Sequence, residues 1–358
     1  MDVLATTQPF SVNLAPSPTQ LEAAARRLLD AGFSTTTYRL RHTELSTFLA
    51  LLLRLRVSNV KWGRDYYFGS FADEDPADEV LANAMAPRLI GSNKADFDKA
   101  LELTMDALPN LVPRFHQLWT TLFQPPMSDF DVELEPTDEN MLSRYLAAAS
   151  LFVPLPEALT PAGLRDRHIS HNKVGASQDE PILSFPSLVH RLQNMPDSHL
   201  ILATNLHDPH APATVIGSFI PSLLCAMSDS SSGTRSRKTG DAHLLFQLQP
   251  NFRLIRWERP QALPKTLIKT NYELASLHAV DAESGQQTCM KPYYIGDSKR
   301  STARLLIHPE GSSVSLHGSK DLSTAAVGRY REVTRSDTGD KDWEVVVQHC
   351  TVHMFAVV

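Results

Sequence analysis

The sequence predicts an α+β protein, with a helical N-terminal region followed by a β-rich C-terminal half. After an irregular, Pro-, Ser- and Thr-rich lead-in over residues 1–18, apolar residues recur up to Phe152 at the three- and four-residue spacing of amphipathic helices. From His199 onwards, short segments alternate instead between the two faces of a strand. Pro154, Pro156 and Pro161 lie between the two patterns. We therefore expect a helical region over residues 1–153 and a β-rich domain over residues 164–358.

The β-rich half is organised around His243–Glu258, which predicts two strands joined by a turn at Gln249-Pro250-Asn251. Leu244, Phe246 and Leu248 alternate onto one face of the first strand. In the second strand, apolar residues fall on both faces. This pattern indicates a strand pair inside a layered structure, not a hairpin on the surface.

Alternation predicts further strands at His199–Thr204, Thr214–Ile220, Ala303–His308, Ser313–His317 and Trp343–Gln348. Together the strands are expected to form a sandwich whose core contains Phe246, Leu248, Leu254, Ile216 and Leu306. A helix over Phe185–Pro196 is expected to pack beside the first sheet. The polar segment Met227–Gly240 has nothing to bury, so we expect a mobile insertion that folding does not need.

In the N-terminal region, helices are predicted where capping residues precede a helical apolar pattern and Gly or Pro follows it. The expected helices run from Thr19 to Gly32, over Thr43–Val57, from the acidic turn Phe71–Glu79 through Met85, from Asn93 or Lys94 to Pro109, over Leu111–Phe123, and over Glu139–Phe152 with Thr137 as its cap.

Length and composition fit a globular protein with a well-filled core, because 42% of the 358 residues are hydrophobic and 21% are charged. The formal net charge of −6 gives no general reason to expect nucleic-acid binding. Cys225, Cys289 and Cys350 are odd in number and far apart, which fits a reducing, cytoplasmic location without disulfides. The first ten residues lack the basic and apolar regions of a secretory signal, and the apolar run Phe48–Val57 is too short for a membrane span.

The side-chain pattern predicts no metal, cofactor or catalytic site. The acidic run Asp73–Glu79 lacks the glycine and the final glutamate of a calcium loop, and it fits a solvated turn at a helix N-terminus. His207 and His210 lack the further ligands of a zinc site, and the Asp-Pro between them is typical of a turn. Gly311–Ser315 is not a G-x-S-x-G nucleophile motif, and no glycine-rich loop opens a helix.

One basic cluster is a candidate interaction surface. Lys299, Arg300 and Arg304 lie near the start of a predicted strand, and the polar insertion adds further basic residues. A solvated surface is the simpler interpretation of such a cluster. The alternative is an electrostatic contact with an acidic partner surface.

Four segments of the C-terminal half resemble the TLDc domain of oxidation-resistance and restriction-of-telomere-capping proteins. FPSLVHRLQNMPDSHLILAT (185–204) is similar to the family's helix and following strand, and HLLFQLQP (243–250) is similar to its F-L-F-x-L-x-P strand and turn. TVIGSFIPS (214–222) resembles the V-F-G-G-F strand, with Gly217 retained and Ser218 in place of the second glycine. ARLLIHPEGSSVSLHGSKDLS (303–323) resembles the later strand pair, whereas His353-Met354-Phe355 departs from the family's closing Glu-Val-Trp.

The resemblance implies a β-sandwich flanked by helices over residues 164–358, with no established catalytic site and no cofactor. It implies a structural role for Gly217, where the backbone would pass close to a neighbour. Phe246, Pro250 and Trp257 become candidates for structural or interaction roles. Members of the family engage the vacuolar proton-pumping ATPase and support resistance to oxidative stress. We therefore expect a non-enzymatic protein that binds and regulates this pump, and that reaches the vacuolar or lysosomal membrane only through it.

A function of a different class stays open, namely a hydrolase or redox enzyme that uses His349 and His353 beside Cys350. Alternation within the final strand would put the two histidines on one face and the cysteine on the other. A buried thiol of this kind is inert by default. Whether these side chains converge or spread over a strand distinguishes this alternative from an interaction protein.

Overall fold

The structure is a computed structural model of the chain. It describes residues 19, 23, 26, 27, 40–62, 64–90, 97–122, 142–153, 169–173, 198–205, 213–220, 243–258, 293–296, 303–307, 313–319, 329–334, 342–348 and 350–357. The chain divides into two compact units. Unit 1 holds Met1–Phe152 and Leu159–Asp166, and unit 2 holds Val153–Ala158 and Arg167–Val358.

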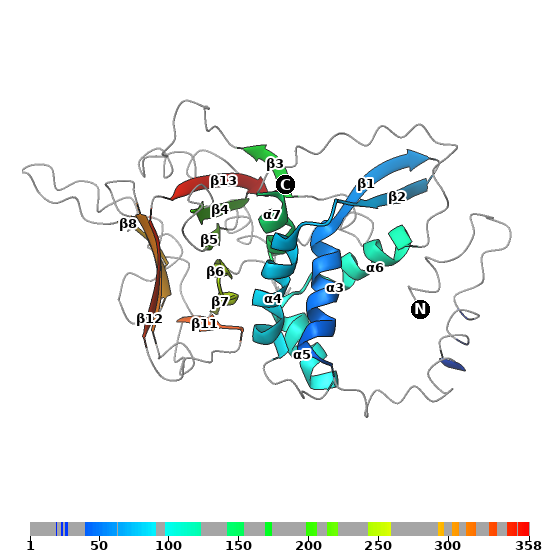
Figure 1. The fold of residues 1–358 in the computed structure, drawn as a ribbon, viewed down its shortest axis with the longest axis horizontal. Coiled ribbons are helices and arrows are strands. Elements are labelled where there is room, and N and C mark those ends of the chain that lie inside the picture. Colours follow the sequence, from blue (N-terminus) through cyan, green and yellow to red (C-terminus); the bar gives the residue numbers. More distant parts are fainter. Residues whose placement is uncertain are drawn as a thin grey trace, which may run out of the picture. The chain divides into compact units, whose positions relative to one another are not determined.

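Unit 1 is mainly helical (Figure 1). Its described helices are α3 (His42–Arg54), α4 (Pro76–Ile90), α5 (Phe97–Ala107), α6 (Leu111–Leu122) and α7 (Ser143–Ala149). Buried leucines at 45, 49, 52 and 53 give α3 an apolar face that packs against α4. At this contact, the Ser46 hydroxyl lies 2.5 Å from Asn83 Oδ1, to which it donates a hydrogen bond.

The helix predicted over Thr43–Val57 is wrong at its C-terminal end. α3 ends at Arg54, and the chain continues as strand β1 (Leu55–Trp62), which pairs antiparallel with β2 (Arg64–Phe71). The leucines of α3 and the apolar residues after Arg54 form one continuous helical pattern in the sequence, so the pattern alone places the helix end too late. The valines and aromatic residues after Arg54 favour strands. Arg54 is the last residue of α3, where the chain passes from helix to strand. Its guanidinium donates a hydrogen bond to the Ala72 carbonyl and pairs with the Glu74 carboxylate, both at 3.1 Å.

The other predicted helices of unit 1 differ from the structure mainly at their ends. α4 continues past Met85 and through Pro87 to Ile90, because Leu89 and Ile90 are buried. α7 ends at Ala149, after which the Leu151 N–H bonds to the Ala148 carbonyl in a turn. The predicted helix at Phe185–Pro196 and the insertion Met227–Gly240 lie outside the described residues. Of the helix predicted from Thr19 to Gly32, the structure describes residues 19, 23, 26 and 27, and these are helical.

Unit 2 contains two antiparallel sheets (Figure 1), and the chain is therefore α+β. The larger sheet has the order β11-β7-β6-β5-β4-β13-β3. Its strands are β3 (Ile169–Lys173), β4 (Ser198–Thr204), β5 (Val215–Ile220), β6 (Leu244–Gln249), β7 (Arg253–Glu258), β11 (Arg329–Glu332) and β13 (Thr351–Val357). The smaller sheet has the order β12-β10-β9-β8, with strands β8 (Tyr293–Gly296), β9 (Ala303–Ile307), β10 (Ser313–Gly318) and β12 (Trp343–Gln348).

The strands expected from alternation are confirmed as β4, β5, β6, β7, β9, β10 and β12, with ends within one residue of the predicted ones. The turn at Gln249-Pro250-Asn251 joins β6 to β7 as expected. In this strand pair every residue of β6 is buried, as are Arg253, Leu254 and Ile255 of β7, whereas Arg256 and Trp257 are partly exposed. The interior position expected from apolar residues on both faces therefore holds for β6 and the first half of β7. The strands β3, β8 and β11 were not expected, because each has only four or five residues, too few to show a clear alternation.

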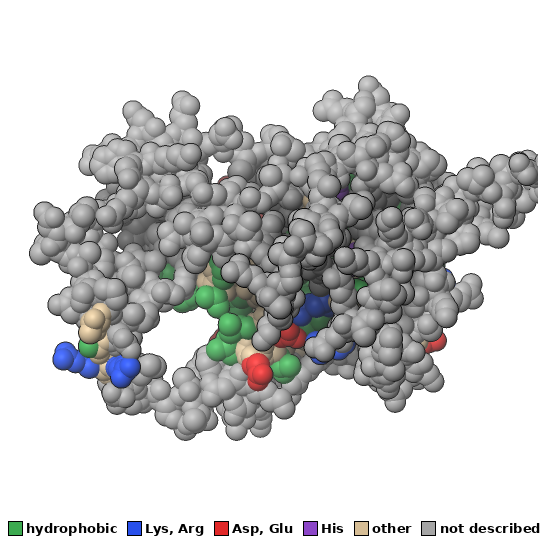
Figure 2. Space-filling model, turned by 180° about the vertical axis from the view of Figure 1, so that it is seen from behind, with side chains coloured by type: hydrophobic (Ala, Val, Ile, Leu, Met, Phe, Trp, Pro, Cys, Tyr) green, Lys and Arg blue, Asp and Glu red, His purple; other side chains and the backbone are tan. Residues whose placement is uncertain are grey.

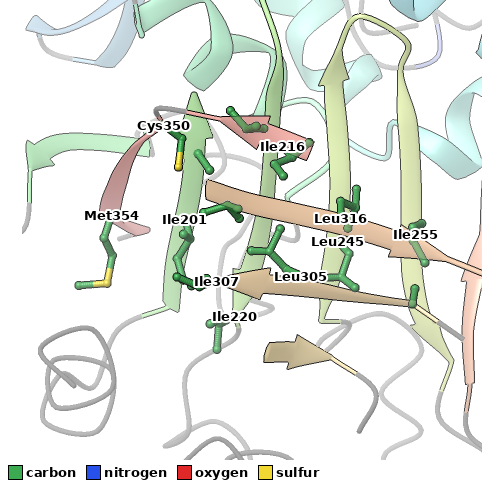
Figure 3. Close-up of a cluster of buried hydrophobic side chains, with 14 of the residues drawn as sticks. Ile201, Ile216, Ile220, Leu245, Ile255, Leu305, Ile307, Leu316, Cys350 and Met354 are labelled. Atoms are coloured by element: carbon green, nitrogen blue, oxygen red, sulfur yellow. The ribbon is translucent and has the colours of Figure 1, made fainter. Parts of the chain in front are cut away.

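One hydrophobic cluster, here named the shared cluster, contains residues of both sheets (Figure 3). Strands of the smaller sheet run across those of the larger one, and Ile201, Leu245 and Leu305 meet between them. The buried members are Ile201, Ala203, Ile216, Ile220, Leu245, Ile255, Ala303, Leu305, Ile307, Val314, Leu316, Tyr330, Val347, Cys350 and Met354.

The predicted core of Phe246, Leu248, Leu254, Ile216 and Leu306 is wrong in its membership. Only Ile216 belongs to the shared cluster. Ile216 lies opposite Gln247, one position from Phe246, so it shares a face with Leu245 instead. Phe246 and Leu254 are buried on the opposite face of the larger sheet, and Leu306 is half-buried on the outer face of the smaller one. Alternation within one strand does not determine the register between strands.

Candidate functional site

A network of three polar side chains lies on the face of the larger sheet that carries the shared cluster. His243 Nε2 is 2.8 Å from the Ser218 hydroxyl, and His243 Nδ1 is hydrogen-bonded to the Tyr330 hydroxyl. Ser218 is in β5, Tyr330 is in β11, and His243 directly precedes β6. Because β7 lies between β6 and β11, this Ser–His–Tyr network reaches across four adjacent strands. Trp257 of β7 packs on Tyr330, with ring centroids 5.0 Å apart.

Ser218 and Tyr330 are buried and His243 is half-buried, and the burial of the imidazole ring determines its protonation. Ser218 and Tyr330 are almost completely inaccessible, and burial lowers the pKa of His243 to about 4. The imidazole is therefore neutral at neutral pH. A neutral imidazole donates from one nitrogen and accepts at the other. In either tautomer, one hydroxyl donates to the ring and the ring N–H donates to the other oxygen.

A Ser–His pair has known chemical uses, but its surroundings differ here from those of an acyl-transfer site. In such sites the imidazole removes the serine proton, and a carboxylate orients the imidazole. In this chain a phenol hydroxyl takes the place of the carboxylate, and the Ser218 side chain is not exposed to solvent. The geometry instead provides a chain of hydrogen bonds from Ser218 through His243 to Tyr330. These hydrogen bonds hold β5, β6 and β11 in place relative to one another.

The depressed pKa of His243 predicts a loss of stability in mild acid. The ordinary value is 6.5, so the unfolded chain binds more protons than the folded one between pH 6.5 and about pH 4. Stability therefore falls as the pH is lowered through this window, with a His243 contribution of about 2 kcal/mol between pH 7 and pH 5. Urea unfolding at both pH values should show a smaller loss for His243→Gln than for the unchanged chain. Equal losses in the two proteins would contradict this account.

A second polar group links the two sheets of unit 2. The side chains of Arg253 in β7 and Glu332 in β11 are 6% and 8% exposed and form an ion pair at 3.5 Å. The Arg253 guanidinium carbon lies 4.2 Å from the ring centroid of Trp343, which belongs to β12 of the smaller sheet. The Thr334 hydroxyl accepts a hydrogen bond from the Leu254 N–H at 3.1 Å and donates one to Glu332 at 3.3 Å. Arg253 is thus held between a carboxylate and an aromatic face.

Gly217 and Phe246, both candidates from the sequence, lie directly opposite each other on β5 and β6. A Cβ atom on Gly217 would lie 2.3 Å from the Ile201 carbonyl oxygen and 2.5 Å from the Phe246 ring. No side chain fits at such distances. The close backbone approach that the resemblance implies for Gly217 is therefore present.

The remaining candidates from the sequence are spread over unit 2. Pro250 is exposed in the turn after β6 and follows a cis peptide bond. Trp257 contacts the Ser–His–Tyr network through Tyr330. Arg304 is half-buried in β9, opposite His317 of β10. Lys299 and Arg300 lie outside the described residues, so the structure places only Arg304 of the basic cluster.

Cys350 and His353, the residues of the enzymatic alternative, lie on opposite faces of the larger sheet. Cys350 belongs to the shared cluster, whereas His353 lies opposite Leu202 and stacks on Phe355 at a centroid distance of 6.4 Å. Burial raises the pKa of the Cys350 thiol, which favours its protonated form. His349 lies outside the described residues. The two described side chains therefore do not converge.

The acidic turn before α4 is occupied by protein contacts. Asp75 Oδ1 accepts a hydrogen bond from the Ala77 N–H at 2.8 Å, and Arg144 pairs with both Asp75 and, at 3.8 Å, Asp78. The hydrogen bond from Arg144 lowers the pKa of Asp75, whereas burial raises the pKa of Asp78. In the part of the chain that the structure describes, no group of three His, Cys, Asp or Glu residues could hold a metal ion. His207 and His210 are not in that part.

The sequence predictions did not include the Ser–His–Tyr network. Its members are separated by 25 and 87 positions along the chain, and only the strand order brings them together. One local signal was present, since Ser218 is a hydroxyl residue inside the otherwise apolar strand Val215–Ile220. A buried hydroxyl needs a hydrogen-bond partner, and this requirement points to a second polar residue nearby.

The fold and this network define an α+β protein that has a helical unit and a unit with two antiparallel sheets. No protein-family model matches the chain, and neither a curated protein nor a solved structure matches it significantly. Among the described residues, no helix is both long and apolar enough to cross a membrane.

Proposed function

We propose that this chain is a non-enzymatic, TLDc-like interaction protein whose two sheets in unit 2 form a β-sandwich. One observation carries the proposal. The segments that resemble the TLDc domain supply β4, β5, β6, β9 and β10, and residues of all five strands belong to the shared cluster. The close packing of Gly217 against Phe246 gives the glycine-bearing segment a physical reason for its glycine.

The partner that we propose is the cytosolic sector of the vacuolar proton-pumping ATPase, which the chain would bind and regulate in support of oxidative-stress resistance. An interaction protein needs accessible surface, and hydrophobic side chains are visible at the surface of the described part in Figure 2. In unit 1, large apolar side chains are exposed at Val80, Leu101, Met105, Val112 and Leu122. Leu101 and Met105 lie one turn apart on α5, where they form an apolar strip.

A two-unit protein suits a large, multi-subunit partner. Each unit has its own buried core, so each can present a separate binding surface. When two linked surfaces bind the same assembly, the second contact forms at a high effective concentration. We therefore propose that both halves of the chain contribute to binding.

Affinity capture from a lysate rich in the pump tests this proposal. We expect the full chain to retrieve pump subunits more strongly than Met1–Phe152 or Leu164–Val358 alone. Replacement of both Leu101 and Met105 by Glu should lower capture about tenfold, because it puts charge into an apolar contact. Glu102→Gln, at an exposed position between them on α5, is the matched control and should leave capture unchanged.

Two results would count against the proposal. If the full chain retrieves no pump subunits, the pump is not its partner. If the Leu101 and Met105 double variant captures as much as the control, the strip on α5 is not part of the contact, even where the pump is retrieved.

A further inference from the structure

The strand β12 is a sheet edge with few of the features that commonly protect an edge strand. Four described strands form the edges of the two sheets in unit 2, namely β11, β3, β8 and β12. β11 and β8 have only four residues each, and the pairing of β3 with β13 is irregular. β12 has six residues in unbroken register with β10, and it contains neither Lys nor Pro. Short length, irregularity, Pro and charged side chains are common protections of an edge, and of these β12 has only the single charge of Glu344.

The two faces of β12 are different in character. Trp343, Val345 and Val347 point toward the shared cluster. Glu344, Val346 and Gln348 are exposed on the outer face, and Val346 is 47% exposed. On any edge strand of an antiparallel sheet, every second residue directs its N–H and C=O groups away from the neighbouring strand. Among the described strands β12 pairs with β10 alone, so its other edge has backbone groups available for pairing next to an exposed valine.

We propose that a second copy of this chain pairs antiparallel with β12, around a two-fold axis that passes beside Val346. In this register Val346 lies opposite Val346 of the second copy, Glu344 lies opposite Gln348, and Val345 lies opposite Val347. The Gln348 amide can donate a hydrogen bond to the Glu344 carboxylate, and no like charges face each other. The edge is thus complementary to itself.

Other registers are less favourable. A shift of two residues in either direction puts Glu344 or Gln348 opposite Val346, so the apolar contact and the polar pair are both lost. A shift of one residue would turn the cluster-facing side chains of the second copy to solvent. In the proposed register the smaller sheets of the two copies form one continuous sheet. The assembly stops at two copies, because both copies use the same edge in the contact.

Sedimentation equilibrium of the full chain tests the association. We expect the unchanged chain to be dimeric at about 100 µM, and Val346→Lys to weaken dimerisation at least about tenfold by placing two ammonium groups opposite each other. Val80→Lys, the same change at an exposed valine of α4, should leave the mass unchanged. A monomeric unchanged chain, or a dimer that Val346→Lys does not weaken, would overturn the proposal.

Cysteine cross-linking tests the register even if the charge variant is unstable. Directly opposite residues of antiparallel strands have Cα atoms about 4.5–5.5 Å apart, which a disulfide can span. Val346→Cys should therefore give a covalent dimer under mild oxidation. Gln348→Cys alone should not cross-link, because in the proposed register the two copies of position 348 are four residues apart along the strands, or about 13 Å. The double variant Glu344→Cys and Gln348→Cys should cross-link, because these two positions lie opposite each other. The unchanged chain, which keeps its native cysteines, sets the background, and equal cross-linking of Val346→Cys and Gln348→Cys would refute the register.

Discussion

Gly217→Ala is expected to destabilise unit 2 by about 3 kcal/mol or more, although it adds a single methyl group. The new Cβ atom would lie 2.3 Å from the carbonyl oxygen of Ile201, on the neighbouring strand β4. This obstacle is backbone, so a rotamer change cannot remove it. β4 and β5 would have to separate at a point where both strands are buried. Urea unfolding of the full chain, compared with the unchanged protein, measures the loss.

Gly318→Ala provides the matched comparison. The three atoms nearest to its added Cβ atom would all belong to the side chain of Trp343, the closest at 2.4 Å. The smaller side chain in Trp343→Leu should therefore remove most of the cost of Gly318→Ala. Phe246→Leu, in contrast, should leave the cost of Gly217→Ala in place, because the Ile201 carbonyl remains. Recovery of Gly217→Ala by Phe246→Leu would show that the ring, not the backbone, is the obstacle.

From the sequence alone, the α+β fold class and most of the helices and strands in the described part could be predicted. The two-residue period of the segments around Ile216, Phe246 and Leu305 is a local property, so it could be read without knowing which strands pair. The same holds for the leucines of α3, which mark a buried helix face. Local patterns of this kind predict whether a segment is helix or strand.

Long-range relations could not be predicted in this way. The strand order and register decide that Ile216 shares a face with Leu245 and not with Phe246. They also bring Ser218, His243 and Tyr330 together from distant parts of the chain. The hairpin of β1 and β2 was missed for a different reason, because the leucine run of α3 leads directly into it at Leu55. A local pattern shows no boundary where one apolar element follows another without a turn.

Phe246→Ala is expected to cost about 3–5 kcal/mol, because the side chain is fully buried and its loss leaves a cavity beside Gly217. Leu306→Ala is the comparison that tests the face assignment. Alternation alone places Leu306 in the same core as Phe246, whereas in the structure Leu306 is half-buried on the outer face of the smaller sheet. Its removal should cost only about 1 kcal/mol. Urea unfolding of the two variants at the same pH gives both values. Similar losses in the two proteins would mean that Leu306 is as buried as Phe246, and that the arrangement of the smaller sheet described above is incorrect.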